Sequence, residues 1–153
     1  MDAHVEPRLA PSHALAEFAA NMRYDDIPPP VRELAKLLIL DALGCGLAAT
    51  DYEFARSTLA GAHALGGDGP CAVIGNQQRL PLRDAALVNG VLLHGLDFDD
   101  SNFLGIVHPT VACLPAALGV GQMRGTSGRD MLTAYVAGME AVRRLPQLQK
   151  EAI

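Results

Sequence analysis

The stretch "LLILDALGCGLAA", residues 37–49, is the most apolar part of the chain and decides its fold class. Before it, Val31, Leu34 and Leu38 recur at helical spacing, so the two stretches predict one long helix that starts amphipathic. From residue 37 the pattern is apolar on all sides, which is typical of a central buried helix. At about 13 residues it is too short to span a bilayer, which takes about 20.

Two glycines interrupt this apolar stretch. Each of Gly44 and Gly46 costs about 1 kcal/mol in a helix relative to alanine. We therefore expect either a close crossing by another helix at these positions or an early end of the helix. Asp41 is the one charged residue of the stretch, and we interpret it as a structural carboxylate with satisfied hydrogen bonds.

The segments on either side of this stretch predict further helices. Proline, serine and glycine residues mark their ends, and the one credible strand is "PCAVIG", residues 70–75. The expected helices cover residues 12–22 and 53–65 and start again near Pro81, Pro109 and Ser127. The sequence therefore predicts an all-α helical bundle with one short β element near residues 70–75.

Composition excludes several classes of function. The 153 residues are 50% hydrophobic and 19% charged, with a formal charge of −5 and no Lys/Arg run, which argues against nucleic-acid or membrane partners. The three cysteines form no C-x-x-C pair, so we expect reduced thiols in a cytoplasmic protein. The N-terminus has acidic residues and prolines where a signal peptide would be basic and apolar.

The chemistry-bearing groups are concentrated in "HGLDFDDSNFLGIVHPT", residues 94–110. A calcium loop starting at Asp97 would need Gly and Glu where Asn102 and His108 stand. "DFDDS" resembles an aspartyl phosphotransferase motif, but the preceding segment has helical rather than strand spacing. A transition-metal site of His94, Asp97 and His108 is chemically possible, although no H-x-x-x-H spacing supports it.

Proton transfer fits these residues better. His108 precedes a helix that starts with proline, so free backbone N–H groups beside its imidazole would suit a substrate carboxylate or phosphate. Ser101 and Thr110 add hydroxyl donors, and a nearby Asp fixes the histidine tautomer. The alternative remains that Asp99 and Asp100 are solvated loop charges and that His94 lies on a helix face with its hydrogen bonds satisfied.

In this order, "LLILDALGCGLAA", "CAVIG", "AALVNGVLLHGLDFDDS" and "HPT" resemble the N-terminal part of the MmgE/PrpD family. That family includes 2-methylcitrate dehydratase, cis-aconitate decarboxylase and an iminodisuccinate epimerase. The resemblance covers roughly residues 12–142. It implies an all-α helical domain, usually in a homodimer, and chemistry on a small di- or tricarboxylic acid without metal or cofactor.

The resemblance also assigns site residues. Asp97, Ser101 and His108 match family active-site positions, with Ser101 in place of the commoner Thr. His108 and Asp97 are then the expected catalytic pair, and Ser101, Thr110 and His94 the expected substrate ligands. Asp99 and Asp100 are assigned to the structure of the motif.

Family members are much longer, and the lysines that neutralise their substrates' carboxylates lie beyond the point where the resemblance fades, near Arg143. We therefore expect a flexible N-terminus over residues 1–11, part of a helical domain over 12–145 and a divergent tail over 146–153. The apolar face of the last helix, with no segment after it, indicates a partner or a further segment.

Three functions remain open at this stage. The first is the N-terminal part of an MmgE/PrpD lyase or isomerase, with dehydration of a 2-methylcitrate-like acid favoured and no activity in the isolated chain. The second is an inactive remnant that forms oligomers or binds carboxylates. The third is a small carboxylate- or metal-binding module that only resembles the family.

Overall fold

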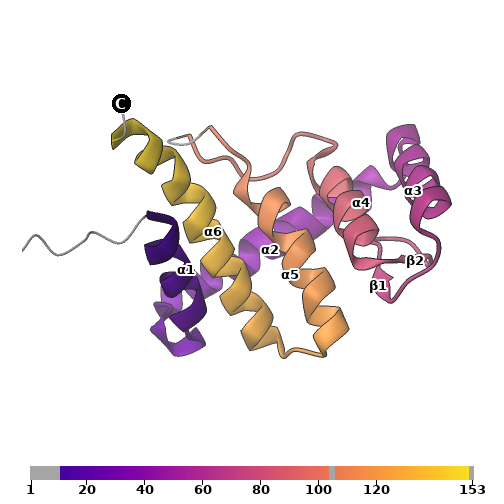
Figure 1. Ribbon diagram of the computed structural model, residues 1–153. Coiled ribbons are helices and arrows are strands. Elements are labelled where there is room, and N and C mark those ends of the chain that lie inside the picture. The colour runs from indigo at the N-terminus through magenta and orange to yellow at the C-terminus, as the bar shows by residue number, and fades with distance from the viewer. Residues whose placement is uncertain (1–10, 104–105, 152–153) are drawn as a thin grey trace, which may run out of the picture.

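The computed structural model describes residues 11–103 and 106–151 (Figure 1). Most of the expected flexible N-terminus and the last two residues of the expected tail lie outside these ranges. The helices and strands are α1 (Pro11–Asn21), the 3-10 helix η1 (Tyr24–Asp26), α2 (Pro29–Ala49), α3 (Glu53–Gly66), β1 (Cys71–Ala72), β2 (Arg79–Leu80), α4 (Leu82–His94), α5 (Pro109–Arg124) and α6 (Gly128–Glu151). The predicted all-α bundle with a short β element is confirmed.

The helix α2 is the element on which the others are arranged. It crosses α4, α5 and α6, which lie side by side in Figure 1, while α3 and α1 flank the two ends of this row. The residues that α2 buries are all small: Ala35, Ala42, Gly46 and Ala49. Small side chains let the helix axes approach closely, so α2 packs closely against α4, α5 and α6.

The expected close crossing occurs at one of the two glycines. A Cβ atom added to Gly46 would lie 3.0 Å from Leu93 of α4 and 3.4 Å from Ile74, whereas a Cβ atom on Gly44 would meet nothing within 4 Å. The helix continues through both glycines to Ala49. Contact with α4 therefore explains Gly46 but not Gly44.

The prediction that α2 is buried on all sides is wrong for the part of the chain that the structure describes. Leu40 is 66% exposed and Leu37 is 62% exposed, and Leu34 and Leu47 are exposed as well. Asp41 is exposed as well, and its interpretation as a structural carboxylate with satisfied hydrogen bonds stays a prediction. The reason is that the described helices cover only one face of α2, and the apolar pattern extends over the other.

Two hydrophobic clusters form the core, and Ile74 packs against both. One cluster joins α3, α4 and the β-hairpin through residues such as Val88 and Leu92. The other joins α2, α4, α5 and α6, and Leu93 of α4, Leu114 of α5 and Tyr135 of α6 are its fully buried members. The loop that carries the candidate site connects α4, which contributes to both clusters, to α5, which contributes Leu114 to the second.

The β element is a two-stranded antiparallel hairpin that pairs Cys71 with Leu80 and Ala72 with Arg79. The sequence predicted β1 but not β2. Asn89 of α4 fixes the hairpin: its Oδ1 accepts from the Ile74 N–H at 2.9 Å, and its Nδ2 donates to the Ala72 carbonyl at 3.0 Å. A buried side chain of α4 thus satisfies backbone groups that a two-residue strand leaves open.

None of the helices within the described ranges is both long enough and apolar enough to cross a membrane.

The two glycines of α2 provide a matched test of the packing. We expect Gly44→Ala to raise the free energy of unfolding by about 1 kcal/mol, because alanine favours the helix and meets open space. Gly46→Ala should lose this gain or destabilise the protein, because Leu93 is fully buried and cannot move aside freely. Urea unfolding measures both. Equal stabilisation by the two substitutions would contradict the described crossing.

Candidate active site

The candidate site lies on the loop from α4 to α5. His94 is the last residue of α4, and His108 is the residue immediately before Pro109, which begins α5 as expected. Within the loop, the Asn102 N–H donates to the Val107 carbonyl at 2.8 Å, and the Val107 N–H donates to the Asn102 carbonyl at 3.3 Å. This antiparallel bridge folds the loop back on itself. Ser101 and His108, the residues next to the bridge on the two arms of the loop, therefore lie across from each other.

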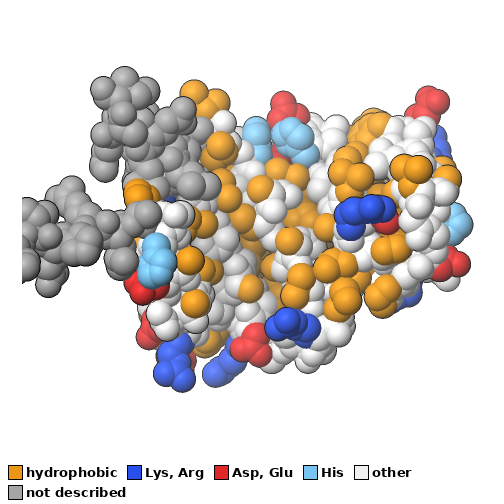
Figure 2. Space-filling model, viewed as in Figure 1, with side chains coloured by type: hydrophobic (Ala, Val, Ile, Leu, Met, Phe, Trp, Pro, Cys, Tyr) orange, Lys and Arg blue, Asp and Glu red, His pale blue; other side chains and the backbone are white. Residues whose placement is uncertain are grey.

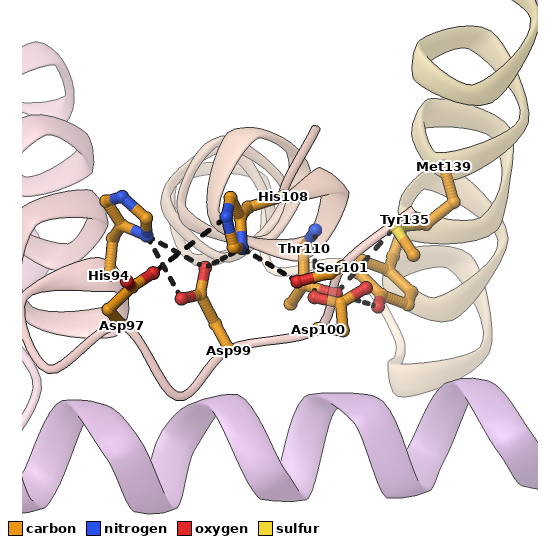
Figure 3. A network of polar contacts seen from close by, with 9 residues as sticks. All are labelled: His94, Asp97, Asp99, Asp100, Ser101, His108, Thr110, Tyr135 and Met139. Carbon is orange, nitrogen blue, oxygen red and sulfur yellow. Dashed lines mark hydrogen bonds and ion pairs between the residues drawn. The ribbon is translucent and has the colours of Figure 1, made fainter. Parts of the chain in front are cut away.

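Alternate residues of the motif face the His108 ring (Figure 3). Asp97 Oδ1 lies 3.9 Å from His108 Nε2, Asp99 Oδ2 lies 3.5 Å from His108 Nδ1, and Ser101 Oγ lies 3.5 Å from the same nitrogen. The intervening Phe98 is 75% exposed. These three contacts collect two carboxylates and a hydroxyl around one imidazole.

Asp99 joins the two histidines. Its side chain is only 1% exposed, and its oxygens lie 3.0 and 3.2 Å from His94 Nδ1 as well as facing His108. The two imidazole rings are 4.8 Å apart between centroids. A carboxylate between them accepts a hydrogen bond from Nδ1–H, which leaves Nε2 of a neutral ring as the basic nitrogen. Asp99 is therefore placed to orient the imidazole of His108, the residue that we expected to act as the acid–base group.

Asp97 is placed by an unusual backbone conformation. Its φ angle is 55°, in the left-handed region that Asp tolerates better than most residues, and its N–H donates to the His94 carbonyl at 2.8 Å. The turn ends α4 and directs the carboxylate back toward Nε2 of His108. Its side chain is 80% exposed, so this carboxylate stays accessible to solvent and to a ligand.

The sequence led us to expect free backbone N–H groups at the N-terminus of α5, but one of them is occupied. The Thr110 N–H donates to Asp100 Oδ1 at 3.3 Å, so a carboxylate of the chain itself occupies part of the helix N-terminus. A negative charge is favoured there by the helix dipole. Asp100 therefore ties the loop to α5, in line with the structural role that we assigned to it.

Thr110 lies apart from the two histidines. It is fully buried, and its Oγ1 lies 2.6 Å from the hydroxyl of Tyr135 on α6 and 3.8 Å from Met139 Sδ. In this structure its hydroxyl links α5 to α6, and its role as a substrate ligand stays a prediction. Burial, which outweighs the hydrogen bond to Thr110, raises the pKa of Tyr135 to about 12.

The charge around the histidines is negative. All the ion pairs that the structure describes for Asp97 and Asp99 have histidine as the partner. Figure 2 shows histidine and acidic side chains together at the upper edge of the molecule, with the Lys and Arg side chains of that face at a distance. Burial, together with the carboxylates of Asp41 and Asp99, raises the pKa of the nearby Cys45, which favours a neutral thiol.

Comparison with known proteins identifies the arrangement. The family model for the MmgE/PrpD N-terminal domain matches residues 13–150, which is most of the chain. The chain belongs to the MmgE/PrpD family. This confirms the resemblance seen in the motifs and sets aside the hypothesis of an unrelated small module.

Several similar curated proteins are cis-aconitate decarboxylases. The protein of Mus musculus is 35% identical over 146 residues, which cover 92% of this chain and 30% of the mouse protein. That of Homo sapiens is 34% identical over 127 residues, which cover 80% of the chain and 26% of the human protein. That of Aspergillus terreus is 28% identical over 136 residues, with shares of 86% and 28%. The chain therefore spans less than a third of the length of these relatives.

The structure brings together most of the site residues expected for an MmgE/PrpD protein. Asp97, Ser101 and His108 meet directly, and His94 joins them through Asp99. We had assigned Asp99 to the structure of the motif, and the structure places its carboxylate between the two histidines of the candidate site. The signal that the sequence offers for this group is the D-x-D-x-S alternation of "DFDDS", whose two aspartates and serine all lie near His108.

The contact between Thr110 and Tyr135 has a measurable energy. We expect Tyr135→Phe to lower the free energy of unfolding by about 1–2 kcal/mol, because it leaves the buried Thr110 hydroxyl with only a weak sulfur partner. The control is Tyr52→Phe, which changes an exposed tyrosine and should have an effect within about 0.5 kcal/mol. Urea unfolding of the three proteins measures the difference. Equal effects of the two substitutions would contradict the described contact.

Stability should fall at alkaline pH. Burial raises the pKa of Cys113 from 9.0 to about 11 and that of Tyr135 from 10.0 to about 12. In both cases the unfolded chain loses the proton first, so the stabilisation is complete below the unfolded pKa and is lost as pH rises through the folded one. We expect the free energy of unfolding to fall between about pH 9 and 12, with a smaller loss above pH 10 in Tyr135→Phe. Parallel pH profiles would show that Tyr135 does not contribute.

Proposed function

We propose that this chain carries the N-terminal part of the active site of a lyase that acts on a small tricarboxylic acid, with decarboxylation of a cis-aconitate-like acid as its reaction. The observation that carries this proposal is the His108 ring, held between a buried carboxylate at Nδ1 and an exposed carboxylate near Nε2. Several similar proteins are cis-aconitate decarboxylases, which supports this reaction class.

The chemistry of this reaction suits an imidazole. Decarboxylation breaks a carbon–carboxylate bond, releases CO₂, and leaves an electron pair that must take up a proton on carbon. His108 can supply that proton through Nε2, while Asp99 orients the ring from the other side. Asp97, 3.9 Å from Nε2, is placed to return a proton to the ring from solvent. Ser101 offers a hydroxyl donor to a substrate carboxylate beside the same ring.

The described residues form part of such a site rather than a complete one. A substrate with several carboxylates needs fixed positive charge, because charge-assisted hydrogen bonds provide most of its binding. The ion-pair partners that the structure describes for Asp97 and Asp99 are histidines rather than lysines or arginines. His94 is about half exposed, which leaves one side of the cluster open. We propose that lysine or arginine residues from a further segment cover this side, and that the isolated 153-residue chain is inactive.

Dehydration of a 2-methylcitrate-like acid, which the sequence favoured, remains a prediction without support from the comparisons. The two reactions are distinguished by their products, because dehydration releases water and decarboxylation releases CO₂. Both use an acid–base group next to a carboxylate, so the described site suits either.

We also propose that the protein forms a homodimer in the cytoplasm. The exposed leucines of α2 support an apolar contact surface. An apolar groove between α2 and α6, lined by Leu34, Leu38 and Met139 among others, supports it further. The cysteines at positions 45, 71 and 113 are all free thiols, which fits a reducing compartment.

The test begins with the intact mass of the protein in its own cells, which sets the length to be expressed. CO₂ release from cis-aconitate is then measured for that protein and for His108→Gln, with His63→Gln as the control on the exposed end of α3. We expect His108→Gln to lower kcat/KM at least about 100-fold, which is typical for loss of a general acid. The control should retain activity.

Two outcomes would contradict the proposal. An active parent protein whose rate is unchanged in His108→Gln would remove His108 from the chemistry. A folded parent that transforms neither cis-aconitate nor 2-methylcitrate would instead support the inactive remnant that the sequence left open.

A further inference from the structure

Four side chains converge at the loop between α4 and α5 in a way that acid–base chemistry alone does not require. His94, Asp97, Asp99 and His108 each offer one nitrogen or oxygen atom, and these four atoms all lie within 4.8 Å of one another. Figure 3 shows the two rings on either side of the Asp99 carboxylate, with Asp97 beside them. Two imidazoles and two carboxylates are a usual ligand set for a transition-metal ion.

The distances match those of a metal site. Two ligands of a tetrahedral Zn²⁺ ion, each about 2.1 Å from the metal, lie about 3.4 Å apart. Asp99 Oδ1 is 3.0 Å from His94 Nδ1, and Asp99 Oδ2 is 3.5 Å from His108 Nδ1. Small movements of these three side chains would therefore bring one ligand atom of each around one ion. Asp97 is 80% exposed and free to turn toward the same point.

The charge of the cluster also favours a cation. Asp97 and Asp99 bring two carboxylates, and within the described ranges their ion-pair partners are histidines, with no lysine or arginine among them. Asp99 is the buried member, and a buried carboxylate is stabilised by a metal ion or an ion-pair partner. In the absence of further basic residues, this cluster attracts a divalent cation more strongly than a polycarboxylate.

We propose that the cluster binds one divalent transition-metal ion, with His94, Asp99 and His108 as its ligands and Asp97 completing the set. The two imidazole ligands select Zn²⁺, Co²⁺ or Ni²⁺ over Mg²⁺ and Ca²⁺, which prefer oxygen. This inference does not depend on the proposed lyase function, because it concerns the ion alone.

Metal binding would have a consequence for acid–base chemistry at the same ring. A metal ion on Nδ1 of His108 leaves the proton of the neutral ring on Nε2, so this nitrogen can no longer accept one. The same ion would replace the hydrogen bonds between His94 and Asp99 and the contact between His108 and Asp99. With the metal bound, His108 could not form the imidazolium that donates a proton in the proposed reaction, so the ion would act as an inhibitor rather than a cofactor.

The experiment is a calorimetric titration of Zn²⁺ into the 153-residue chain without any carboxylic acid present. We expect one ion per chain. His94→Ala should weaken binding more than about tenfold, since loss of even an outer hydrogen-bonding partner of a metal ligand costs about 10–100-fold. His94 is about half exposed, so its loss should leave the fold intact, and Asp99→Asn is the second variant. Mg²⁺ in excess should not displace Zn²⁺.

The control uses a histidine–aspartate pair elsewhere on the molecule. His63 Nε2 lies 3.2 Å from Asp68 Oδ1 near the end of α3, without the second histidine that the proposed site has. His63→Ala should therefore bind Zn²⁺ as the parent does. Circular dichroism of each variant confirms that the helices are formed.

Several results would overturn the proposal. The folded chain failing to bind Zn²⁺ would do so, as would equal binding by the parent, His94→Ala and Asp99→Asn. Co²⁺ provides an independent check, because a thiolate-to-cobalt absorption band would place the ion on a cysteine instead. Failure of these tests leaves the lyase proposal untouched, since that proposal is tested by CO₂ release.

Discussion

The carboxylate of Asp99 lies between the end of α4 and the start of α5, and the geometry of the site depends on it. It faces Nδ1 of both His94 and His108, although its own side chain is almost completely buried. A buried carboxylate without partners is strongly unfavourable, so the two histidines and the loop between them are held in one arrangement. Asp100 adds a second tie by accepting the Thr110 N–H at the N-terminus of α5. Together these contacts make the 14-residue connection, residues 95–108, into a site with defined distances.

The site and the outward face of α2 have one property in common. The cluster around Asp99 has more negative charge than the described residues neutralise, and α2 has more apolar surface than they cover. The similar decarboxylases are more than three times as long as the part that this chain matches. Basic residues from a further segment and helices packed on α2 would resolve both features. A bound divalent cation would resolve the first alone, and it would do so at the expense of His108 as a proton donor.

The sequence predicted the helices well because their signals are local. Proline at the start of α5, glycine and proline near the ends of other helices, and apolar residues at helical spacing act within a few residues of one another. It also predicted which motif contains the candidate site, since histidines and aspartates are gathered there in a chain that otherwise has few charged residues. The short strand β2 was missed because two residues have no periodicity to detect. Its partner strand β1 is held by Asn89 of α4, which follows Ala72 by 17 residues in the sequence.

By itself, the sequence determined the fold class, the family and the loop that holds the site, because each follows from residue types at short spacing. The tertiary structure decided how the members of the motif divide their roles. Asp99 faces the histidines while Asp100 faces α5, and Thr110 is buried against Tyr135 instead of joining the cluster. It also decided that α2 leaves leucines such as Leu37 and Leu40 exposed to solvent. These outcomes depend on which elements meet in space, and no local pattern specifies that.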